Sequence, residues 1–334
     1  MQFTINPKLS RVLCLTFIIL ISLILPEIIF SQSKGQLYDL LSVSFPTERE
    51  GWACGRWGTV LHTADGGKSW VRQQSGTDYT LSSVFFVDPQ NGWAVGDGGT
   101  ILHTKDGGKT WVKQKSPIPY FLMGVYFANF QKGWIVTERT TILYTEDGGQ
   151  NWQIQFKDKD FILKRVSFCD ERNGWAVGEF GYIYHTDNGG KTWQKQAGNF
   201  AFSKETGEIV GGNFLFDVIA INTQTALVVG IEGYIANTTD GGKTWQKKTN
   251  GVPNVHLFGV AHKEGIFIIV GNALLLTSSD WGKTFKKAMV KQQITYGWIY
   301  SIVPRGDAGF VSVGKGGWIY LSDKPGTSWH RVVY

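Results

Sequence analysis

A short motif recurs seven times along this chain of 334 residues, at nearly even spacing. The motif reads Asp-x-Gly-x-Ser/Thr-Trp, as in Asp106–Trp111, with Asn188 replacing the Asp in the fourth copy and one extra residue in the seventh. A period of about forty residues, with Gly-rich turns between segments rich in β-branched and aromatic residues, is typical of β-propeller blades. The closing aromatic residues lie 41 residues apart three times and then 52, 40 and 44 residues apart, at Trp70, Trp111, Trp152, Trp193, Trp245, Phe285 and Trp329.

Each repeat predicts four short strands. In the second repeat these are Leu81 to Val87, Gly92 to Gly96, Thr100 to Thr104 and Thr110 to Gln114, with Gly, Asp, Asn and Pro at the connections. We therefore predict an all-β fold, a seven-bladed β-propeller of four-stranded antiparallel blades, as a single domain over residues 32–334. The last repeat ends on its own fourth strand, so we expect closure by packing of the first blade on the seventh. A segment before Leu37 is the candidate for an extra outer strand.

The N-terminus has a different composition. Lys8 and Arg11 precede an apolar run over residues 12–25, which Pro26 and several polar residues follow. This pattern predicts a signal peptide over residues 1–31, because the run is shorter than the ~20 apolar residues that a membrane span needs. We expect export, to the periplasm or the extracellular space.

The repeated polar residues suit structural roles. Asp106 can accept hydrogen bonds from its own turn, Gly107 and Gly108 allow unusual backbone angles, and Trp111 can pack over the hairpin. A residue needed once for chemistry has no reason to recur on every blade, and the histidines at equivalent places on separate blades are too far apart to share an ion. We predict no catalytic, metal or cofactor site from these positions. The histidines are His62, His103 and His185.

Function is expected where the repeats differ. Strand alternation puts the hairpins between second and third strands on the face opposite the Asp turns, together with the loops that enter each blade. Exposed aromatics mixed with charges are typical of protein-binding surfaces. One aligned hairpin column holds Arg56, Asp97, Glu138, Glu179, Ile231, Asn272 and Lys315, with Trp57 and Arg139 beside it. The incoming loops add Tyr79, Tyr120, Phe121, Phe161, Phe200, Phe202, His256, Tyr296 and Trp298.

A second column lies in the innermost strands and consists of Ser42, Ser83, Gly124, Arg165, Asp217, Gly259 and Ser301. Small residues suit the crowded axis, so the two charged members are the exceptions. Arg165 and Asp217 belong to adjacent blades and can pair across the channel. Two interpretations stay open: a ligand site at the channel mouth, or an internal salt link without a ligand.

Residues 197–212 form the one large insertion, between the fourth and fifth repeats. Its polar, Gly-containing sequence predicts a long surface loop. Long loops in compact domains are disproportionately functional, and they are also tolerated at small energetic cost, so both interpretations stay open.

With the repeats aligned, the strand Asn-Gly-Trp-Ala-Val-Gly and the turn Asp-Gly-Gly-Lys-Thr-Trp resemble the Asp-box repeats of sialidase-type propellers. Period, blade number and this strand resemble the photosystem II stability and assembly factor family more closely. That resemblance implies a non-catalytic propeller that binds a membrane-protein assembly intermediate through an arginine-rich patch. The residues that can match such a patch are Arg56, Arg139 and Arg165, interrupted by Asp97, Glu138 and Glu179.

We predict an exported, non-catalytic, monomeric scaffold for a protein partner, such as a membrane or envelope protein. The net charge of +6 is spread over many Gly-Gly-Lys turns, which argues against nucleic acid as a partner. The predicted partner-binding residues are Arg56, Trp57, Arg139, Arg165, Asp217 and Lys315. The alternative is a carbohydrate-binding or glycoside-hydrolysing propeller, for which two suitably spaced carboxylates suffice. Its candidate residues are Asp97, Glu138 and Glu179.

Overall fold

The computed structural model describes residues 37–334 except 203–204, 207–208, 249–253 and 292–296. The predicted signal peptide, the predicted strand before Leu37 and Tyr296 therefore lie outside the described residues, as does the side chain of Phe202. Residues Tyr38–Tyr334 form one compact unit. Within the described part of the chain, helices of the length and hydropathy needed to cross a membrane are absent.

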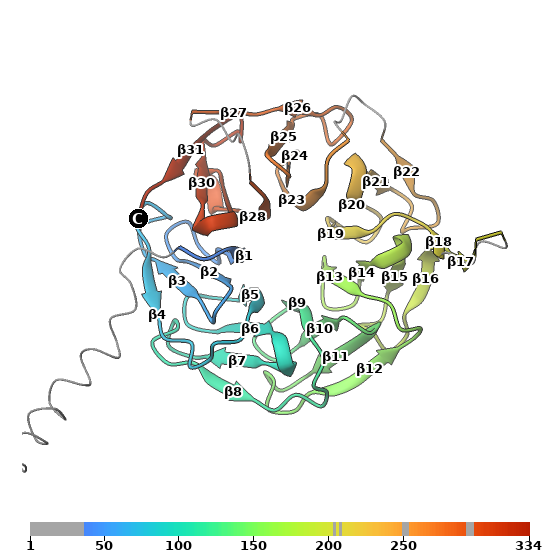
Figure 1. The fold of residues 1–334 in the computed structure, drawn as a ribbon, viewed down its shortest axis with the longest axis horizontal. Coiled ribbons are helices and arrows are strands. Elements are labelled where there is room, and N and C mark those ends of the chain that lie inside the picture. Colours follow the sequence, from blue (N-terminus) through green and yellow to red (C-terminus); the bar gives the residue numbers. More distant parts are fainter. Residues whose placement is uncertain (1–36, 203–204, 207–208, 249–253, 292–296) are drawn as a thin grey trace, which may run out of the picture. The chain divides into compact units, whose positions relative to one another are not determined.

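Seven sheets stand around a common axis as the blades of a propeller, each with four antiparallel strands and the seventh with a short fifth strand at its outer edge (Figure 1). In each blade the strands follow chain order from the axis to the rim, so the predicted meander and the predicted seven-bladed fold are confirmed. The hydrophobic clusters combine residues of neighbouring blades, which places the core between the blades. Short 3-10 turns, η1 to η5, are the helical elements of the described residues: Asp97–Gly99, Glu179–Gly181, Ile231–Gly233, Gly306–Ala308 and Lys315–Gly317.

Blades one to four share nearly the same strand lengths. Blade one holds β1 (Leu40–Ser44), β2 (Gly51–Gly55), β3 (Val60–Thr63) and β4 (Val71–Gln73). Blade two holds β5 (Leu81–Phe86), β6 (Gly92–Gly96), β7 (Ile101–Thr104) and β8 (Val112–Gln114). Blade three holds β9 (Leu122–Phe127), β10 (Gly133–Thr137), β11 (Thr141–Thr145) and β12 (Gln153–Lys157). Blade four holds β13 (Leu163–Phe168), β14 (Gly174–Gly178), β15 (Ile183–Thr186) and β16 (Gln194–Ala197).

Blades five to seven vary more, and two of them have outer strands of only two residues. Blade five holds β19 (Leu215–Ala220), β20 (Ala226–Gly230), β21 (Ile235–Thr238) and β22 (Gln246–Lys247). Blade six holds β23 (Leu257–Lys263), β24 (Ile266–Gly271), β25 (Leu274–Ser278) and β26 (Lys286–Lys287). Blade seven holds β28 (Ile299–Pro304), β29 (Phe310–Gly314), β30 (Ile319–Ser322) and β31 (Ser328–Val332).

The Asp turns use their carboxylates internally. In blade two, Asp106 accepts hydrogen bonds from the backbone N–H of Thr110 at 2.9 Å, from its hydroxyl at 2.6 Å and from the Thr104 hydroxyl at 2.8 Å. The two glycines of the turn, Gly107 and Gly108, have φ values of +73° and +81°, a region that other residues avoid. These turns therefore serve the stability of each blade.

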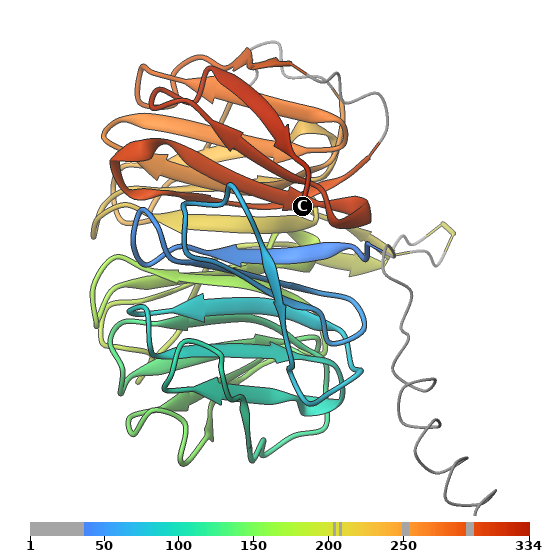
Figure 2. The same cartoon turned by 90° about the vertical axis from the view of Figure 1, so that its left-hand side faces the viewer.

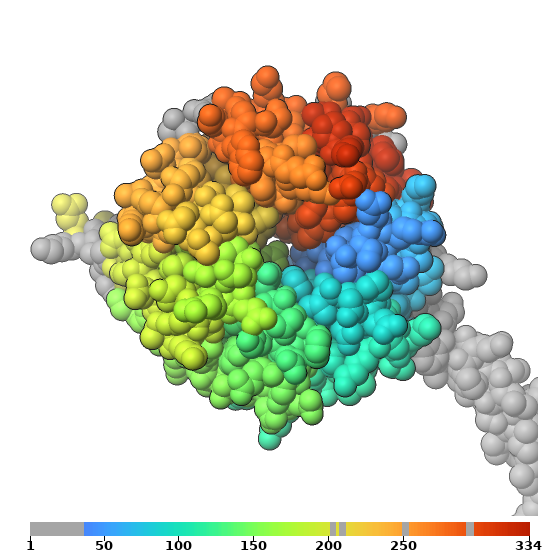
Figure 3. Space-filling view, turned by 180° about the vertical axis from the view of Figure 1, so that it is seen from behind, coloured from blue at the N-terminus to red at the C-terminus, as the bar shows by residue number. Residues whose placement is uncertain are grey.

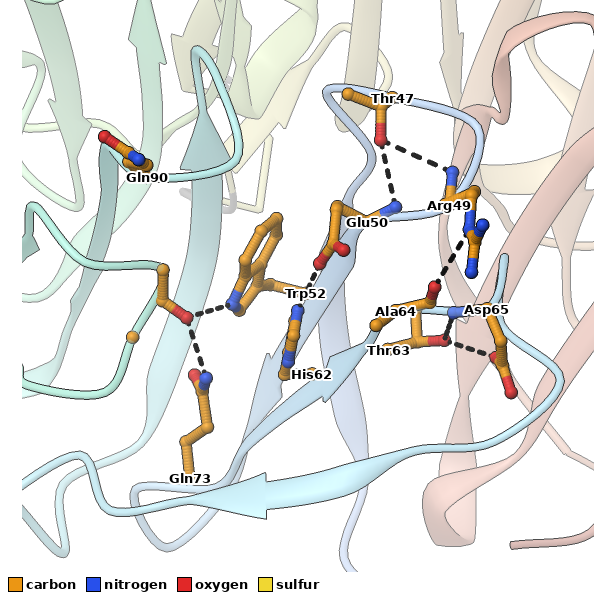
Figure 4. A network of polar contacts seen from close by, with 12 residues as sticks. Thr47, Arg49, Glu50, Trp52, His62, Thr63, Ala64, Asp65, Gln73 and Gln90 are labelled. Atoms are coloured by element: carbon orange, nitrogen blue, oxygen red, sulfur yellow. Dashed lines mark hydrogen bonds and ion pairs between the residues drawn. The ribbon is translucent and has the colours of Figure 1, made fainter.

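A polar latch joins each of the first blades to the next one. The indole N–H of Trp52 and the amide of Gln73 both donate to the carbonyl of Gly107 in blade two, at 3.1 and 2.8 Å (Figure 4). Equivalent pairs on blades two and three, Trp93 with Gln114 and Trp134 with Gln155, bind Gly148 and Gly189. Each latch thus anchors a blade on the Asp turn of its neighbour.

The ring closes without a strand exchanged between the described parts of blades one and seven. The Arg305 guanidinium donates to the carbonyl of Gly66 at 2.8 Å, and the Ser301 hydroxyl accepts from the backbone of Val43 at 3.4 Å. The extra outer strand of blade seven is β27 (Met289–Val290), which runs parallel to β31. It comes from the connection between blades six and seven; the segment before Leu37, which the sequence suggested as an outer strand, lies outside the described residues.

The insertion is more ordered than the predicted loop. Two short strands, β17 (Phe200–Phe202) and β18 (Ile209–Gly211), pair antiparallel and form a hairpin beside blade four, which Figure 2 shows in yellow, extending from the ring. The ring of Phe200 lies 4.8 Å from that of Phe161 and 5.0 Å from that of Phe180. These aromatic contacts hold the base of the hairpin on blade four.

Candidate functional site

The hairpins between second and third strands share an unusual backbone conformation. In six blades their central residue has a left-handed φ of about 51–63°; it is glycine in blades two and seven, at Gly98 and Gly316, and it is Phe180, Glu232 and Ala273 in blades four to six. In blade one the same place is taken by Trp57 with φ 56°. A bulky residue in this region costs on the order of 1–2 kcal/mol, and such strain is often retained at binding sites. Trp57 is also 60% exposed, so core packing does not account for it.

Charged residues surround Trp57 on this face. The Arg56 guanidinium lies 3.2 Å from the carboxylate of Asp39 and its side chain stays 56% exposed. Asp39 also accepts a hydrogen bond from the backbone of Gly316 in blade seven at 2.8 Å, which ties blade one to the hairpin that carries Lys315. The site is therefore fixed from two blades.

Arg139 and Lys315 lie on the same face, each above an aromatic ring. The Arg139 guanidinium lies 4.6 Å from the ring centre of Tyr120 and 3.9 Å from Asp160, and the Lys315 ammonium lies 5.9 Å from that of Trp298. Stacking on rings holds these cations with their charge available to a ligand. The face therefore presents exposed cations from blades one, three and seven.

Arg165 lies apart from these residues, inside the channel. Its guanidinium lies 3.0 Å from the carboxylate of Asp217 and donates to the Ser83 hydroxyl at 3.4 Å. Asp217 also accepts from the backbone of Val218 and Val260 at 2.9 and 3.0 Å. Burial raises the pKa of Asp217, while Arg165 counteracts this. The predicted pairing of these two charges thus occurs, as an internal salt link in which both carboxylate oxygens of Asp217 accept hydrogen bonds.

Arg165 separates two cavities along the axis. On the side of the Asp turns the channel encloses about 370 Å³, and Figure 3 shows the hollow between the blades from this side. On the hairpin side a second cavity of about 220 Å³ opens at the mouth. Arg165 lines both cavities, so the Arg165–Asp217 pair divides the channel.

The wall of the mouth cavity includes one residue from every blade, each placed just after the start of the innermost strand. In every blade the pairing register shifts at this residue, which marks a β-bulge. Bulges re-aim a side chain, here into the mouth. The seven residues of this mouth ring are Leu41, Ser82, Met123, Lys164, Phe216, Phe258 and Tyr300.

Sequence reasoning missed the mouth ring. In a regular strand, neighbouring residues point to opposite sides, so these residues are expected to point away from the channel, into which the column of Arg165 and Asp217 points. The bulge changes their direction. The signal was present as an aligned column immediately before that of Arg165 and Asp217. It changes from Leu, Ser, Met and Lys in blades one to four to three aromatic residues in blades five to seven.

A family model described as photosynthesis system II assembly factor YCF48 matches residues 29–118, 68–153, 113–199 and 201–334. The chain belongs to the YCF48 family. These overlapping matches follow the repeat and extend over almost all of the propeller. No curated protein sequence matches the chain.

Solved structures of YCF48 proteins share the fold. The structure described as YCF48 bound to D1 peptide is 21% identical, with a TM-score of 0.69 over 86% of this chain and 93% of that one. YCF48 from Cyanidioschyzon merolae is 18% identical, with a TM-score of 0.68 over 86% and 97% of the two chains. A GH74 xyloglucanase from Xanthomonas campestris is 12% identical, with a TM-score of 0.69 over 90% of this chain and 55% of the enzyme. At these identities the likeness concerns the fold.

The three candidate carboxylates of this YCF48 family member hold their own loops. Glu138 accepts a hydrogen bond from the backbone N–H of Phe121 at 3.1 Å, and Glu179 accepts one from Ile162 at 3.2 Å. Asp97 accepts from the adjacent Gly98 at 2.7 Å. Across the described residues, no three His, Cys, Asp or Glu side chains lie close enough together to hold a metal ion. The geometry thus gives these carboxylates a structural use.

Proposed function

We propose that this YCF48 family member is an exported, non-catalytic and monomeric scaffold that binds a protein partner, a membrane or envelope protein during its assembly. The proposed binding surface is the hairpin face, centred on Arg56 and Trp57 and extended by Arg139 and Lys315. Arg165 and Asp217 act behind it, as the salt link that closes the channel under the mouth. Mass spectrometry of the mature N-terminus from cell fractions tests the proposed export and cleavage near residue 31.

The observation that carries this proposal is Trp57, a 60% exposed aromatic beside the exposed Arg56, in a left-handed backbone conformation that glycine takes in two other blades and Phe180, Glu232 and Ala273 take in three. Tryptophan and arginine are among the residue types enriched at the energetic centres of protein interfaces. The family assignment supports the same conclusion, as does the solved YCF48 structure described as bound to D1 peptide.

The glycoside alternative has weaker support. A xyloglucanase shares the fold, but the carboxylates available here, at Asp97, Glu138 and Glu179, accept hydrogen bonds from backbone N–H groups. A general acid needs a carboxyl group that is free to give its proton to a substrate oxygen. We therefore favour the scaffold.

The test is crosslinking and tagged co-purification of the full chain from its native host. We expect a specific membrane or envelope protein to be enriched, and we expect the Arg56→Glu/Arg139→Glu variant to lose it. The matched control reverses two exposed lysines of an Asp turn on the opposite face, Lys105→Glu and Lys109→Glu. Equal recovery with both variants, or no enrichment with the native chain, contradicts the proposal.

A second variant separates binding from folding. Trp57→Gly relieves the left-handed strain, so it should leave the unfolding midpoint unchanged or raise the free energy of unfolding by up to about 1 kcal/mol. The same change should weaken capture of the partner at least tenfold, which is a typical loss at an interface centre. Loss of partner with full stability supports the proposal, whereas unchanged capture assigns Trp57 no role in binding.

A further inference from the structure

The mouth cavity combines an aromatic wall with a cation. The ring of Phe258 lies 5.0 Å from that of Phe216, in an edge-to-face arrangement, and 5.6 Å from that of Tyr300. Met123 from blade three contributes to the same cavity. All four side chains are only half-buried, so an apolar group placed among them gains by removing their surface from water.

Two cations line this cavity: Arg165, which is paired with Asp217, and Lys164. In the described part of the chain its ammonium has no hydrogen bond or ion pair, and the nearby carboxylate of Asp217 is already bound by Arg165 and two backbone N–H groups. Burial, and then repulsion from Arg165, lower the pKa of Lys164 to about 8. A cation in such surroundings is stabilised by an arriving carboxylate.

The size of the cavity decides between kinds of occupant. Its volume of about 220 Å³ lies below the roughly 300–1,000 Å³ of typical small-molecule pockets and is comparable with one large side chain. It opens on the same face as Trp57, between the cations of that face. We propose that the mouth cavity receives one large apolar side chain of a protein partner, with a neighbouring carboxylate of that partner paired to Lys164. This inference rests on the proposed function and specifies the chemistry that it recognises.

The first experiment measures peptide binding to the full chain by ligand-observed NMR. The probe is acetyl-Gly-Ser-Phe-Asp-Ser-Gly-amide, compared with two matched peptides in which Ala replaces the Phe or Asn replaces the Asp. We expect the Phe-Asp peptide to bind about tenfold more tightly than either matched peptide, because each lacks one of the two contacts. Equal binding of the Asp and Asn peptides overturns the proposal.

Variants of the cavity assign the two contacts. Lys164→Met should abolish the preference for Asp over Asn and keep the preference for Phe over Ala, while Lys164→Arg should retain both. Phe258→Ala should show the converse loss. The Asp preference of the native chain should also decline as the pH rises past about 8, where Lys164 loses its proton. An unchanged Asp preference in Lys164→Met contradicts the role of Lys164.

The remaining outcomes separate this inference from the proposed function. If 3-phenylpropanoate binds in a Lys164-dependent way and none of the peptides binds, the cavity takes a small acid and the partner assignment is overturned. If the native partner is captured equally by the native chain and by Lys164→Met, the mouth inference fails while the scaffold stands. If peptides discriminate as expected and no partner is captured, the scaffold fails and the recognition chemistry of the mouth stands.

Discussion

Blades one to four and blades five to seven share one plan but use different contacts at their seams. In blades one to four the second strand carries a buried tryptophan and the fourth strand carries a glutamine, and the first three such pairs bind the Asp turn of the next blade. In blades five to seven the tryptophan is replaced by Leu227, Ile268 and Val311, and the glutamine by Lys248, Ala288 and Val332. At the seams between blades, blades one to four thus use polar latches, whereas blades five to seven place aliphatic side chains where the tryptophans would be.

The mouth of the channel differs between the same two halves. Blades five to seven place Phe216, Phe258 and Tyr300 there, whereas blades one to four place smaller or charged side chains. The half with the period of 41 residues is the half in which each latch reaches the same turn of the next blade. Blades five to seven, which lack the tryptophan and glutamine of the latch, carry the aromatic wall of the mouth cavity. The regular repeats thus coincide with the polar latches, and the departure from them coincides with the aromatic wall on which the mouth inference rests.

The largest effect should come from Trp93→Ala in blade two. This indole is fully buried, stacks 3.6 Å from the Phe127 ring of blade three and donates to Gly148. Its loss should lower the free energy of unfolding by about 3–5 kcal/mol. The matched change in the other half, Leu227→Ala, should cost about 2–4 kcal/mol because it leaves a smaller cavity. Urea midpoints measure both, and equal losses would mean that the latch adds nothing to packing.

The sequence predicted the fold well because the latch and the Asp turn repeat. The Asp turn recurs seven times, once with Asn188 in place of the Asp, and the tryptophan equivalent to Trp93 recurs in blades one to four, so each copy supports the same local structure. The face of the hairpins was also predictable, since strand alternation places Arg56 and Arg139 there. The two-residue strand of Met289 and Val290 was not predictable, because its pairing with the last strand depends on a long connection that has no repeat pattern.

The candidate site was predicted only in part for a physical reason. Arg165 was predicted both to pair with Asp217 across the channel and to join Arg56 and Arg139 in an arginine patch; the structure shows the pairing, and the residue lies in the channel, apart from those two. Lys164 escaped notice because a bulge changes the direction of its side chain, and bulges leave no mark in the hydrophobic alternation. The direction of the Lys164 side chain thus depends on a local irregularity of the backbone, which neither residue type nor repeat period reveals.

Removal of a single latch amide tests whether the polar contacts themselves matter. Gln114→Leu keeps the side-chain volume but deletes the hydrogen bond to Gly148 at 2.9 Å and the acceptor of the Trp152 indole N–H at 3.1 Å. We expect a loss of about 1–3 kcal/mol from the two unpaired groups. Lys248→Leu, at the equivalent place of blade five, should change stability by less than about 0.5 kcal/mol. A similar loss in both variants would remove the distinction between the halves.

The histidine of blade two should make the latched half sensitive to mild acid. Burial against Trp93, and then Lys105, lower the pKa of His103 to about 4, from an ordinary value of 6.5. Between pH 6.5 and pH 4, His103 therefore binds a proton in the unfolded chain but not in the folded chain. The free energy of unfolding should fall as the pH drops through this range. His103→Asn, which copies Asn237 of blade five, should flatten this slope. Exposed His330→Asn is the control, and an equal change of slope in it would contradict the assignment.

The smallest effect concerns the Asp turns, where blade four has Asn188 in place of the Asp. Hydrogen bonds from Thr110 and Thr104 lower the pKa of Asp106 to about 2, so its contribution is present above pH 3.8 and is lost as the pH falls through 2. Asn188 makes the same contacts, with its oxygen accepting from Thr192 at 3.0 Å and its amide donating to the Thr192 hydroxyl at 2.8 Å. It has no proton to gain.

Asp106→Asn should therefore leave the melting temperature nearly unchanged at pH 7 and make it fall less steeply between pH 4 and pH 2. Asn188→Asp should do the opposite and add one acid-sensitive turn to blade four. Thermal melts of both variants over this range measure the two slopes. If both slopes equal that of the native chain, the carboxylates of the Asp turns stabilise the blades through hydrogen bonds that do not depend on charge.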